Sequence, residues 1–439
     1  MSDIQKTDHI TILGLGHVGL TLGLALADVG YDVSGYDIKE DVRTKTRNRI
    51  SHFKEKGLQE LLDTHVGNKF NVVDSLEKHA YPVAYFVTVG TPFKHDNTPD
   101  YTYIKNAAAD LAHVLQKGDM VLLRSTVPLG TTRDVVVAII ERESTLKAGE
   151  DFAVAFAPER TVEGNAFEEL RTLPQIIGGY DADSLARART LFAPLTETIV
   201  ALDSLEEAEV VKLINNTYRE TVFAFANQVS LLSRAWGLDT KKVIAAANVG
   251  YPRSQVPFPS PGVGGYCLTK DAYLFKESAR KKDVDTRLLS EVRQNTSTML
   301  DVMTKDIRNF AKENFPKKRV RVGILGFAFK GKPETSDVRG SSTSALTKRL
   351  NHFKDMDIVG FDPLVAPEVV SSMGAVPKDS IEEVIGGSDI VVVMNNNPAF
   401  SVIAPQHFTS SQKVLLFDTW GVIPKDAFLN HASVVYWSL

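Results

Sequence analysis

Short apolar runs rich in β-branched residues alternate with helical patterns through the first 200 residues of the chain. The runs are HITILG, DVSGYD, VAYFVTVG, MVLLRSTVP, DFAVAFAPE and ETIVAL, each closed by glycine, proline or a polar turn. Strands that alternate with helices pair in parallel and are covered on both faces. The pattern therefore predicts a mostly parallel sheet between two layers of helices.

A different pattern occupies the middle of the chain. From Leu205 to Trp236 an apolar periodicity predicts one long helix, and further helices are expected at 240–248 and 286–314. Strand patterns return in RVGILGFAF, IVGFD, IVVVMN and KVLLFDT. We therefore expect an α/β protein with two Rossmann-like, doubly wound parallel-sheet domains at 1–203 and 318–439, joined by a central helical domain at 204–317.

Length and composition agree with a globular protein of this kind. At about 150 residues per domain, 439 residues suggest three domains, and 43% hydrophobic and 24% charged residues are ordinary for soluble chains. Lys and Arg (50) nearly balance Asp and Glu (54), with no long basic run, so we expect no nucleic-acid partner. The only cysteine, Cys267, excludes an intramolecular disulfide. Without a signal-like leader or a long apolar run, we expect a cytoplasmic protein with no membrane partner.

A glycine motif follows the first predicted strand. Gly14-Leu15-Gly16-His17-Val18-Gly19 opens an apolar helix, and Asp37 ends the next strand 18 residues after Gly19. Such glycines let backbone amides approach a pyrophosphate at a helix amino terminus, and the carboxylate accepts hydrogen bonds from the ribose hydroxyls while repelling a 2′-phosphate. The motif predicts NAD rather than NADP. A glycine turn with no ligand is the alternative.

Two further strands end in polar segments where open α/β sheets collect ligand contacts. These are Gly90-Thr91-Pro92 and Ser125-Thr126-Val127-Pro128. In the last α/β region, Phe329-Lys330 and Asp337-Val338-Arg339 follow a strand in the same way, where a second nucleotide could bind. Each of these four segments is also compatible with an ordinary turn.

The segment Gly264-Gly265-Tyr266-Cys267-Leu268-Thr269-Lys270-Asp271 places a thiol, an amine and a carboxylate within five residues. A thiolate is the nucleophilic form of cysteine, and a nearby cation such as Lys270 would favour it. Asp271 could then handle a proton. A lone cysteine is otherwise a small buried hydrophobe, and Asp271 could instead cap a helix that begins near Ala272.

On the long helix, Lys212 and Asn216 are four residues apart and therefore project from one face. A cation and an amide at this spacing could hold an oxyanion. A lysine that simply faces solvent is the alternative.

The order of these motifs, GxGxxG, STVP, PER, KxxxN, GGYCxxKD, FK and DVR, closely resembles the UDP-sugar 6-dehydrogenases and their nucleotide-sugar relatives over nearly the whole chain. The most specific element is GGYCLTKD, since this family carries its nucleophilic cysteine in such a segment. The resemblance implies a four-electron oxidation of the sugar C6 alcohol to a carboxylate, with two NAD and one water consumed.

The resemblance also implies roles for individual residues. It assigns Cys267 to the thiohemiacetal and thioester, Lys212 and Asn216 to the substrate oxygen, and Asp271 and Thr126 to the water. Further cofactor contacts are implied for Thr91, Lys270 and Arg339. Further substrate contacts are implied for Arg160, for Gly264, for Lys330, and for Val256 and Phe258 of the loop 256–260. Glu159 and Glu163 would line the reacting sugar and the nicotinamide side. Arg253 would reach the partner's pocket in a homodimer formed through the central helices.

Several positions depart from the common family pattern. Thr269 replaces the usual proline, Gly340 stands where a glutamate generally follows the arginine, and Gln228 replaces a glutamate. The interval from Arg253 to Cys267 is also shorter than in some UDP-glucose enzymes, and it limits how far the loop 256–260 and Arg253 can reach.

Substrate choice depends on Pro158-Glu159-Arg160, since UDP-glucose enzymes typically have Pro-Glu-Phe there and the UDP-N-acetylhexosamine branch has Pro-Glu-Arg. We therefore favour UDP-N-acetylmannosamine or UDP-N-acetylglucosamine, with UDP-glucose as the alternative. Two other classes stay open. A two-electron hydroxyacid-type dehydrogenase would not need Cys267, and a non-enzymatic NAD-sensing protein would keep only the glycine motif.

Overall fold

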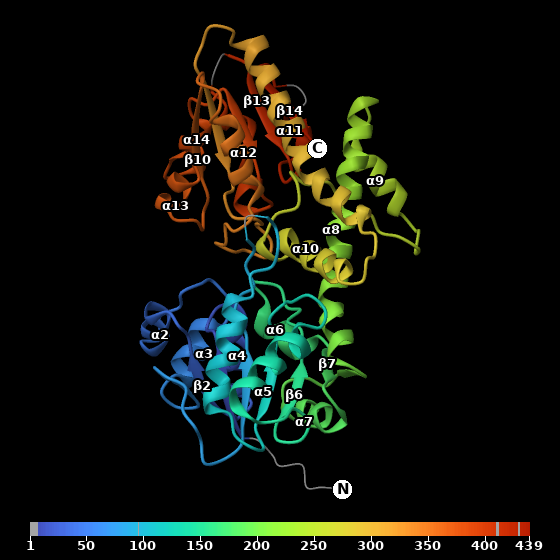
Figure 1. Ribbon diagram of the computed structural model, residues 1–439. Helices are drawn as coiled ribbons and strands as arrows, with labels where there is room; N and C mark the ends of the chain where they lie inside the picture. The colour runs from blue at the N-terminus through green and yellow to red at the C-terminus, as the bar shows by residue number, and fades with distance from the viewer. Residues whose placement is uncertain (1–7, 95, 410–411, 429–430) are drawn as a thin grey trace. The chain divides into compact units, whose positions relative to one another are not determined.

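The computed structural model describes residues 8–94, 96–409, 412–428 and 431–439 (Figure 1). The chain divides into two compact units. The first comprises the chain up to Asn215 together with Tyr273–Asp285, and the second comprises Asn216–Ala272 and Thr286–Leu439. The boundaries between units fall inside two helices and at one loop, and the three-domain division expected from the sequence stays a prediction.

The described residues of the first unit contain an eight-stranded sheet in the order β3-β2-β1-β4-β5-β6-β7-β8. All neighbouring strands are parallel except β6 and β7. The strands are β1 (His9–Leu13), β2 (Asp32–Tyr36), β3 (Phe70–Val72), β4 (Val83–Val87), β5 (Met120–Leu123), β6 (Ala153–Phe156), β7 (Gln175–Gly179) and β8 (Ile199–Leu202).

Helices cover both faces of this sheet because its central strands are apolar on both sides (Figure 1). One apolar core lies between the sheet and α1 (His17–Asp28), α3 (Leu58–His65), α6 (Ala166–Thr172) and α7 (Ala182–Phe192). The other lies against α4 (Thr102–Val114), the π-helix η1 (Thr132–Val137), α5 (Ala138–Ser144) and the start of α8. The short helix α2 (Glu40–Arg47) follows β2.

The second unit has an all-parallel sheet of six described strands in the order β11-β10-β9-β12-β13-β14. They are β9 (Val320–Leu325), β10 (Met356–Phe361), β11 (Val376–Pro377), β12 (Ile390–Val393), β13 (Val414–Asp418) and β14 (Val434–Ser438). Two apolar cores again cover its faces. Around it lie α12 (Ser342–Leu350), α13 (Pro367–Ser372), α14 (Ile381–Ile385), η2 (Pro398–Val402), η3 (Pro405–His407) and η4 (Lys425–Phe428).

Long helices form the middle of the chain. They are α8 (Leu205–Ala235), α9 (Thr240–Asn248), α10 (Tyr266–Arg280) and α11 (Arg287–Asn314). The predicted fold class, two Rossmann-like parallel sheets with a helical region that includes one long helix, is confirmed. The sequence patterns missed β3, β7, β11 and β14; β3 and β11 have only three and two residues, and β7 ends in two glycines.

One expected helix start is wrong. We expected a helix from about Ala272, which Asp271 would cap in the alternative to its catalytic role, but α10 already begins at Tyr266. Gly265 has φ +90° and ends the preceding turn, and its carbonyl accepts the first hydrogen bond, from the Thr269 amide. Cys267 is thus the second residue of a helix, and Asp271 lies inside it.

None of the described helices combines the length and apolarity needed to cross a bilayer.

Candidate active site

The glycine motif forms a tight turn between β1 and α1. Gly14 has φ +97°, and its amide donates to the Tyr36 carbonyl at 2.7 Å. The Thr88 hydroxyl donates to the carbonyls of Leu13 and Gly14 at 2.9 and 2.8 Å. A Cβ on Gly19 would lie 1.8 Å from the Gly14 carbonyl oxygen, so only glycine lets α1 begin this close to the turn.

The residues of this turn fit NAD. A Cβ built on Gly16 meets no protein atom within 4 Å, which leaves the amino terminus of α1 open to a phosphate. Asp37 is half-buried at the end of β2, where its carboxylate accepts the Leu15 amide at 2.8 Å and the Lys39 amide at 2.9 Å. The carboxylate is thereby held beside the turn, as ribose recognition requires.

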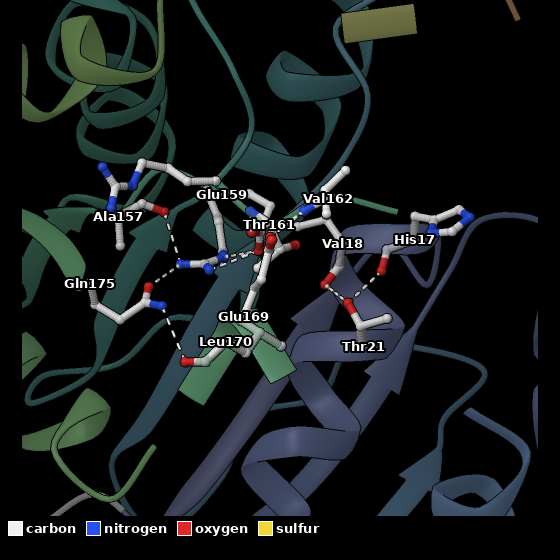
Figure 2. Close-up of polar contacts among 12 residues, drawn as sticks. His17, Val18, Thr21, Ala157, Glu159, Thr161, Val162, Glu169, Leu170 and Gln175 are labelled. Atoms are coloured by element: carbon white, nitrogen blue, oxygen red, sulfur yellow. Dashed lines mark hydrogen bonds and ion pairs between the residues drawn. The ribbon is translucent and has the colours of Figure 1, made fainter. Parts of the chain in front are cut away.

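The first turn of α1 is tied to itself by a side chain. Figure 2 shows the Thr21 hydroxyl donating to the carbonyls of His17 and Val18, at 2.6 and 3.2 Å. Thr21 is buried, so its hydroxyl is not available to contact a ligand. These two hydrogen bonds hold the first turn of α1 in place, so the amides of His17 and Val18 stay at the start of the helix.

The ends of β4 and β5 bring two predicted residues together. The buried Thr91 hydroxyl donates to the Thr126 carbonyl at 2.7 Å, and the Ser125 hydroxyl donates to the Val89 carbonyl at 2.6 Å. The Thr126 side chain is half-buried. The two loops therefore meet at the carboxyl edge of the first sheet.

Glu159, labelled in Figure 2, is buried after β6 and forms an ion pair with Arg124, which directly follows β5. Arg124 Nε and Nη2 donate to Glu159 Oε2 at 3.0 and 2.7 Å, and the Thr161 amide donates to Oε1 at 2.6 Å. Burial opposes the charge, but Arg124, Thr161 and Lys212 outweigh it and hold the pKa of Glu159 below its ordinary value. Glu159 therefore stays ionised at neutral pH.

Sequence reasoning missed Arg124, although a charge at the end of the apolar run MVLL was a usable signal. Its remaining donor, Nη1, reaches the Ala157 carbonyl and Gln175 Oε1 at 3.2 and 3.3 Å. Lys212 is only 8% exposed, so the alternative of a solvent-facing lysine is wrong. Arg160 donates to the Pro174 carbonyl at 3.0 Å. Glu163 lies one residue before Gly164 in the loop that follows.

In the second unit, α10 carries two of the predicted catalytic residues, Cys267 and Asp271, and Asp271 bonds a third, Asn216 of α8. Cys267 is exposed, which excludes the alternative of a small buried hydrophobe. Asp271 is 1% exposed, accepts a hydrogen bond from Asn216 Nδ2, and lies 3.1 Å from Lys270 Nζ. The structure thus joins Asn216, Lys270 and Asp271 in one buried network on the helix that carries the thiol.

A buried glutamate adjoins this network. Glu220 lies one helical turn after Asn216 on α8 and pairs with Arg293 of α11. Burial first, and then the charge of Asp271, raise the pKa of Glu220 against the effect of Arg293. The sequence analysis missed Glu220, although its spacing of four from Asn216 and eight from Lys212 places all three on one helix face.

The cysteine segment packs on the segment 329–340 of the same unit. The Gly265 amide donates to the Gly340 carbonyl at 3.2 Å, and a Cβ on Gly265 would lie 2.7 Å from the Phe329 ring. The Arg339 guanidinium lies 4.8 Å from the Tyr266 ring centroid. Lys330 Nζ lies 5.4 Å from the Phe329 centroid. Glycine at 340 keeps this contact close, since a Cβ there would crowd the Gly265 backbone.

Three predicted substrate residues lie elsewhere in the second unit. Arg253 is exposed and donates to the Tyr251 hydroxyl at 3.0 Å. The Val256 amide and carbonyl both bond the Asn248 side chain, at 2.9 and 2.8 Å. Phe258 is 49% exposed. Within the described part of this unit, the segment is anchored to α9, and its predicted substrate role stays a prediction.

Comparison with protein families matches three consecutive parts of the chain to one family. Residues 8–196 match the NAD binding domain of the UDP-glucose/GDP-mannose dehydrogenase family, residues 206–297 its central domain, and residues 323–425 its UDP binding domain. Together these matches cover most of the chain.

Relatives and solved structures agree. The UDP-N-acetyl-D-mannosamine dehydrogenase of Pyrococcus horikoshii is 31% identical over 90% of this chain and 91% of its own length. The UDP-glucose 6-dehydrogenase of Haloferax volcanii is 26% identical over 97% of this chain and 100% of its own. A solved structure of the Pyrococcus horikoshii UDP-D-ManNAc dehydrogenase has a TM-score of 0.87 and 28% identity, with 98% of each chain covered.

Proposed function

Because this chain belongs to the UDP-glucose/GDP-mannose dehydrogenase family and is an NAD-dependent UDP-sugar dehydrogenase, we propose that it oxidises the C6 alcohol of UDP-N-acetylmannosamine to the carboxylate. The observation that carries the proposal is the amino-terminal turn of α10. There an exposed thiol precedes a buried amine–carboxylate–amide network by three residues. The family resemblance of the sequence, the NAD cofactor and the enzyme class are confirmed. A purely non-enzymatic NAD-binding protein is therefore excluded.

The proposed reaction has two oxidations joined by a covalent step. The C6 alcohol loses a hydride and a proton to give an aldehyde, and the Cys267 sulfur adds to its carbonyl carbon to give a thiohemiacetal. Loss of a second hydride and proton leaves a thioester. Water then adds, the carbon–sulfur bond breaks, and the carboxylate and the free thiol are released. NAD, when bound, accepts one hydride in each oxidation.

The chain's own residues have separate tasks in this scheme. The amino terminus of α10 stabilises an anionic sulfur at Cys267. Lys212 and Asn216 hold the developing oxyanion, and Asp271, together with Thr126, orients the water and accepts its proton. Glu159 cannot serve as an acid at neutral pH because Arg124 keeps it ionised. We therefore assign it to orienting the loop 161–166, whose Thr161 amide it binds.

The acetamido sugar is the preferred substrate for two reasons. Arg160 follows Glu159, as in the UDP-N-acetylhexosamine branch, and the relatives with the higher identities are UDP-N-acetyl-D-mannosamine dehydrogenases. UDP-glucose is the second candidate, supported by the relative in Haloferax volcanii. We expect the reaction to take place in the cytoplasm.

We also propose that the enzyme is a homodimer formed through α8. Tyr218, Phe225, Leu232 and Trp236 recur at helical spacing and are 67%, 57%, 60% and 76% exposed. Large apolar side chains exposed at this spacing are typical of a protein interface. Leu232→Asp should give monomers in sedimentation. A wild-type protein that sediments as a monomer would contradict the proposal.

The decisive experiment counts NADH formed per sugar consumed with UDP-N-acetylmannosamine, UDP-N-acetylglucosamine and UDP-glucose in turn. We expect a ratio of two, the highest kcat/KM with UDP-N-acetylmannosamine, and a loss of at least about 1,000-fold in kcat for Cys267→Ala. Asp271→Asn should accumulate a sugar adduct on Cys267, visible as added protein mass. A ratio of one, with activity that survives Cys267→Ala, would instead favour the two-electron dehydrogenase.

A further inference from the structure

The segment 51–57 lies between α2 and α3. It contacts two loops at the carboxyl edge of the first sheet, and we call these two contacts its anchors. Its first anchor is the glycine turn. His52 Nε2 lies 2.9 Å from the Leu15 carbonyl oxygen, and the Phe53 ring stacks on the His17 ring with centroids 3.8 Å apart. Burial lowers the pKa of His52, so the ring is neutral, and Nε2 carries the hydrogen because a carbonyl can only accept.

The second anchor is the loop that carries Glu163. Glu55 is 7% exposed, and its two carboxylate oxygens accept the amides of Gly164 and Ala166 at 2.7 and 3.0 Å. These residues are 109 and 111 positions away along the chain. A charged acceptor bonded to two amides fixes a backbone more firmly than neutral hydrogen bonds do.

Carboxylates hold the rest of this loop in the same way (Figure 2). The Thr161 amide donates to Glu159 at 2.6 Å, and the Val162 amide donates to Glu169 at 2.7 Å. Glu159 and Glu169 come from the loop itself and from α6, whereas Glu55 comes from the segment that rests on the glycine turn. Glu55 is therefore the carboxylate that ties the loop to the cofactor side.

We propose that residues 51–55 act as a strap, and that Glu55 is a positioning residue that fixes the Glu163 loop relative to the glycine turn. The strap couples dinucleotide binding to the order of the substrate-lining loop, and this use of Glu163 rests on the proposed function. A ligand that fixes the glycine turn also fixes the positions of Leu15 and His17. These residues contact His52 and Phe53 of the strap, so the strap and its Glu55 are fixed as well.

The test compares Glu55→Ala and Glu55→Gln with Glu168→Gln, which changes an exposed glutamate on α6 that has no part in the strap. With UDP-N-acetylmannosamine, Glu55→Ala should lower kcat/KM about 10- to 100-fold, since small displacements of positioning groups have effects of this size. NADH affinity should fall less than kcat/KM does, because no NAD contact is removed and only the coupling to the loop is lost. Glu55→Gln should restore part of the loss, since one oxygen remains to accept an amide.

A second readout distinguishes positioning from a general effect on folding. Combined with Glu163→Gln, Glu55→Ala should add little further loss, because both changes act on one loop. Losses that multiply in the double variant, or a drop in melting temperature with unchanged kcat/KM, would overturn the proposal.

Hydrogen exchange tests the strap without reference to turnover. NADH should slow the exchange of the amides in 161–166 in the wild type and in Glu168→Gln, but not in Glu55→Ala. Equal protection in all three proteins would refute the coupling. If NADH binds and protects the loop while no UDP-sugar is oxidised, the proposed function fails and the strap stands.

Discussion

The two sheets of this protein begin in the same way, but they differ in the space that is left around the turn after the first strand. In each, the first strand ends at a glycine with positive φ, Gly14 at +97° and Gly326 at +95°. After Gly14 the helix α1 begins within three residues, whereas after Gly326 the helix α12 begins only at Ser342. A Cβ on Gly326 would lie 2.7 Å from Asn395 and one on Gly14 only 3.3 Å from Thr88, but two residues after Gly14 a Cβ on Gly16 meets open space. The first turn is open and the second is filled.

The aspartates that end the second strand of each sheet differ in the same sense. Asp37 is half-buried and accepts two amides. Asp362 is 4% exposed and accepts the amides of Phe327, Ala328, Leu364 and Val365 at 2.6 to 3.2 Å. A carboxylate bonded to four amides has no lone pair left for a ribose. The same chain pattern thus leaves a half-buried carboxylate beside a glycine turn in one unit, the predicted dinucleotide site, and forms a structural brace in the other.

The largest expected effect comes from Gly19→Ala. The new methyl group would collide with the Gly14 carbonyl, so the turn must change shape. NADH affinity should fall at least about 1,000-fold, or 4 kcal/mol. As a control, Gly326→Ala also forces a Cβ against a neighbouring residue, and it should leave NADH affinity within about threefold because Gly326 lies outside the proposed dinucleotide site. Fluorescence titration of NADH measures both, and an equal loss in the two variants would break the comparison.

Asp362→Ala should destabilise the second unit without affecting the cofactor. Four buried amides lose their acceptor, and even with partial relaxation the free energy of unfolding should drop by about 3 kcal/mol. Urea denaturation measures the loss, and NADH titration of the folded fraction should match the wild type. A variant with normal stability and weakened NADH binding would mean that Asp362 serves a ligand after all.

The first unit also has a pH-dependent brace. Glu209 accepts the amides of Gly130 and Thr132 and the Thr132 hydroxyl, and holds the loop after β5. Burial, helped by Glu206, raises the pKa of Glu209 from 4.5 to about 7 against these hydrogen bonds. The folded state therefore binds a proton that the unfolded state releases near pH 4.5. The stability that this proton provides is complete below that pH and is lost as pH rises towards 7.

Glu209→Gln removes the titration. Its free energy of unfolding relative to the wild type should rise between pH 5 and pH 8, by at most roughly 3 kcal/mol, and melting temperatures measured across this range would show the trend. Glu206→Gln, on the same helix and 33% exposed, is the control and should show a much smaller trend. A flat difference across this pH range for Glu209→Gln would mean that Glu209 is ionised throughout.

Sequence patterns predicted what is local and missed what is distant. The long helix was expected at Leu205–Trp236 and spans Leu205–Ala235, because its apolar periodicity repeats over many turns. The strand β7 was missed because QIIGG is short, carries two glycines and runs antiparallel to β6. The first turn of α10 could not be predicted because the two glycines directly before it favour a turn and disfavour a helix.

The site divides along the same line. The glycine turn and the cysteine segment are contiguous in sequence, so their chemistry could be predicted. The carboxylates that brace them find partners far away, Glu55 at 109 residues and Glu209 at 79. Arg124 pairs with Glu159 at 35 residues. No local sequence pattern predicts such pairs, because a buried charge needs a partner and only the fold brings the two residues together.

The smallest and sharpest test concerns Asp37. Asp37→Ala removes the ribose acceptor and the charge that repels a 2′-phosphate, so kcat/KM with NAD should fall about tenfold while that with NADP rises. The ratio of the two constants isolates recognition from stability, since the loss of the hydrogen bonds from Leu15 and Lys39 affects both cofactors alike. Asp37→Asn separates the two causes further. The amide keeps one acceptor oxygen but not the charge, so it should retain more NAD activity than alanine while tolerating NADP equally. If both variants keep the wild-type preference, the open turn of the first unit does not read the ribose through Asp37, and the contrast with Asp362 would then rest on the glycines alone.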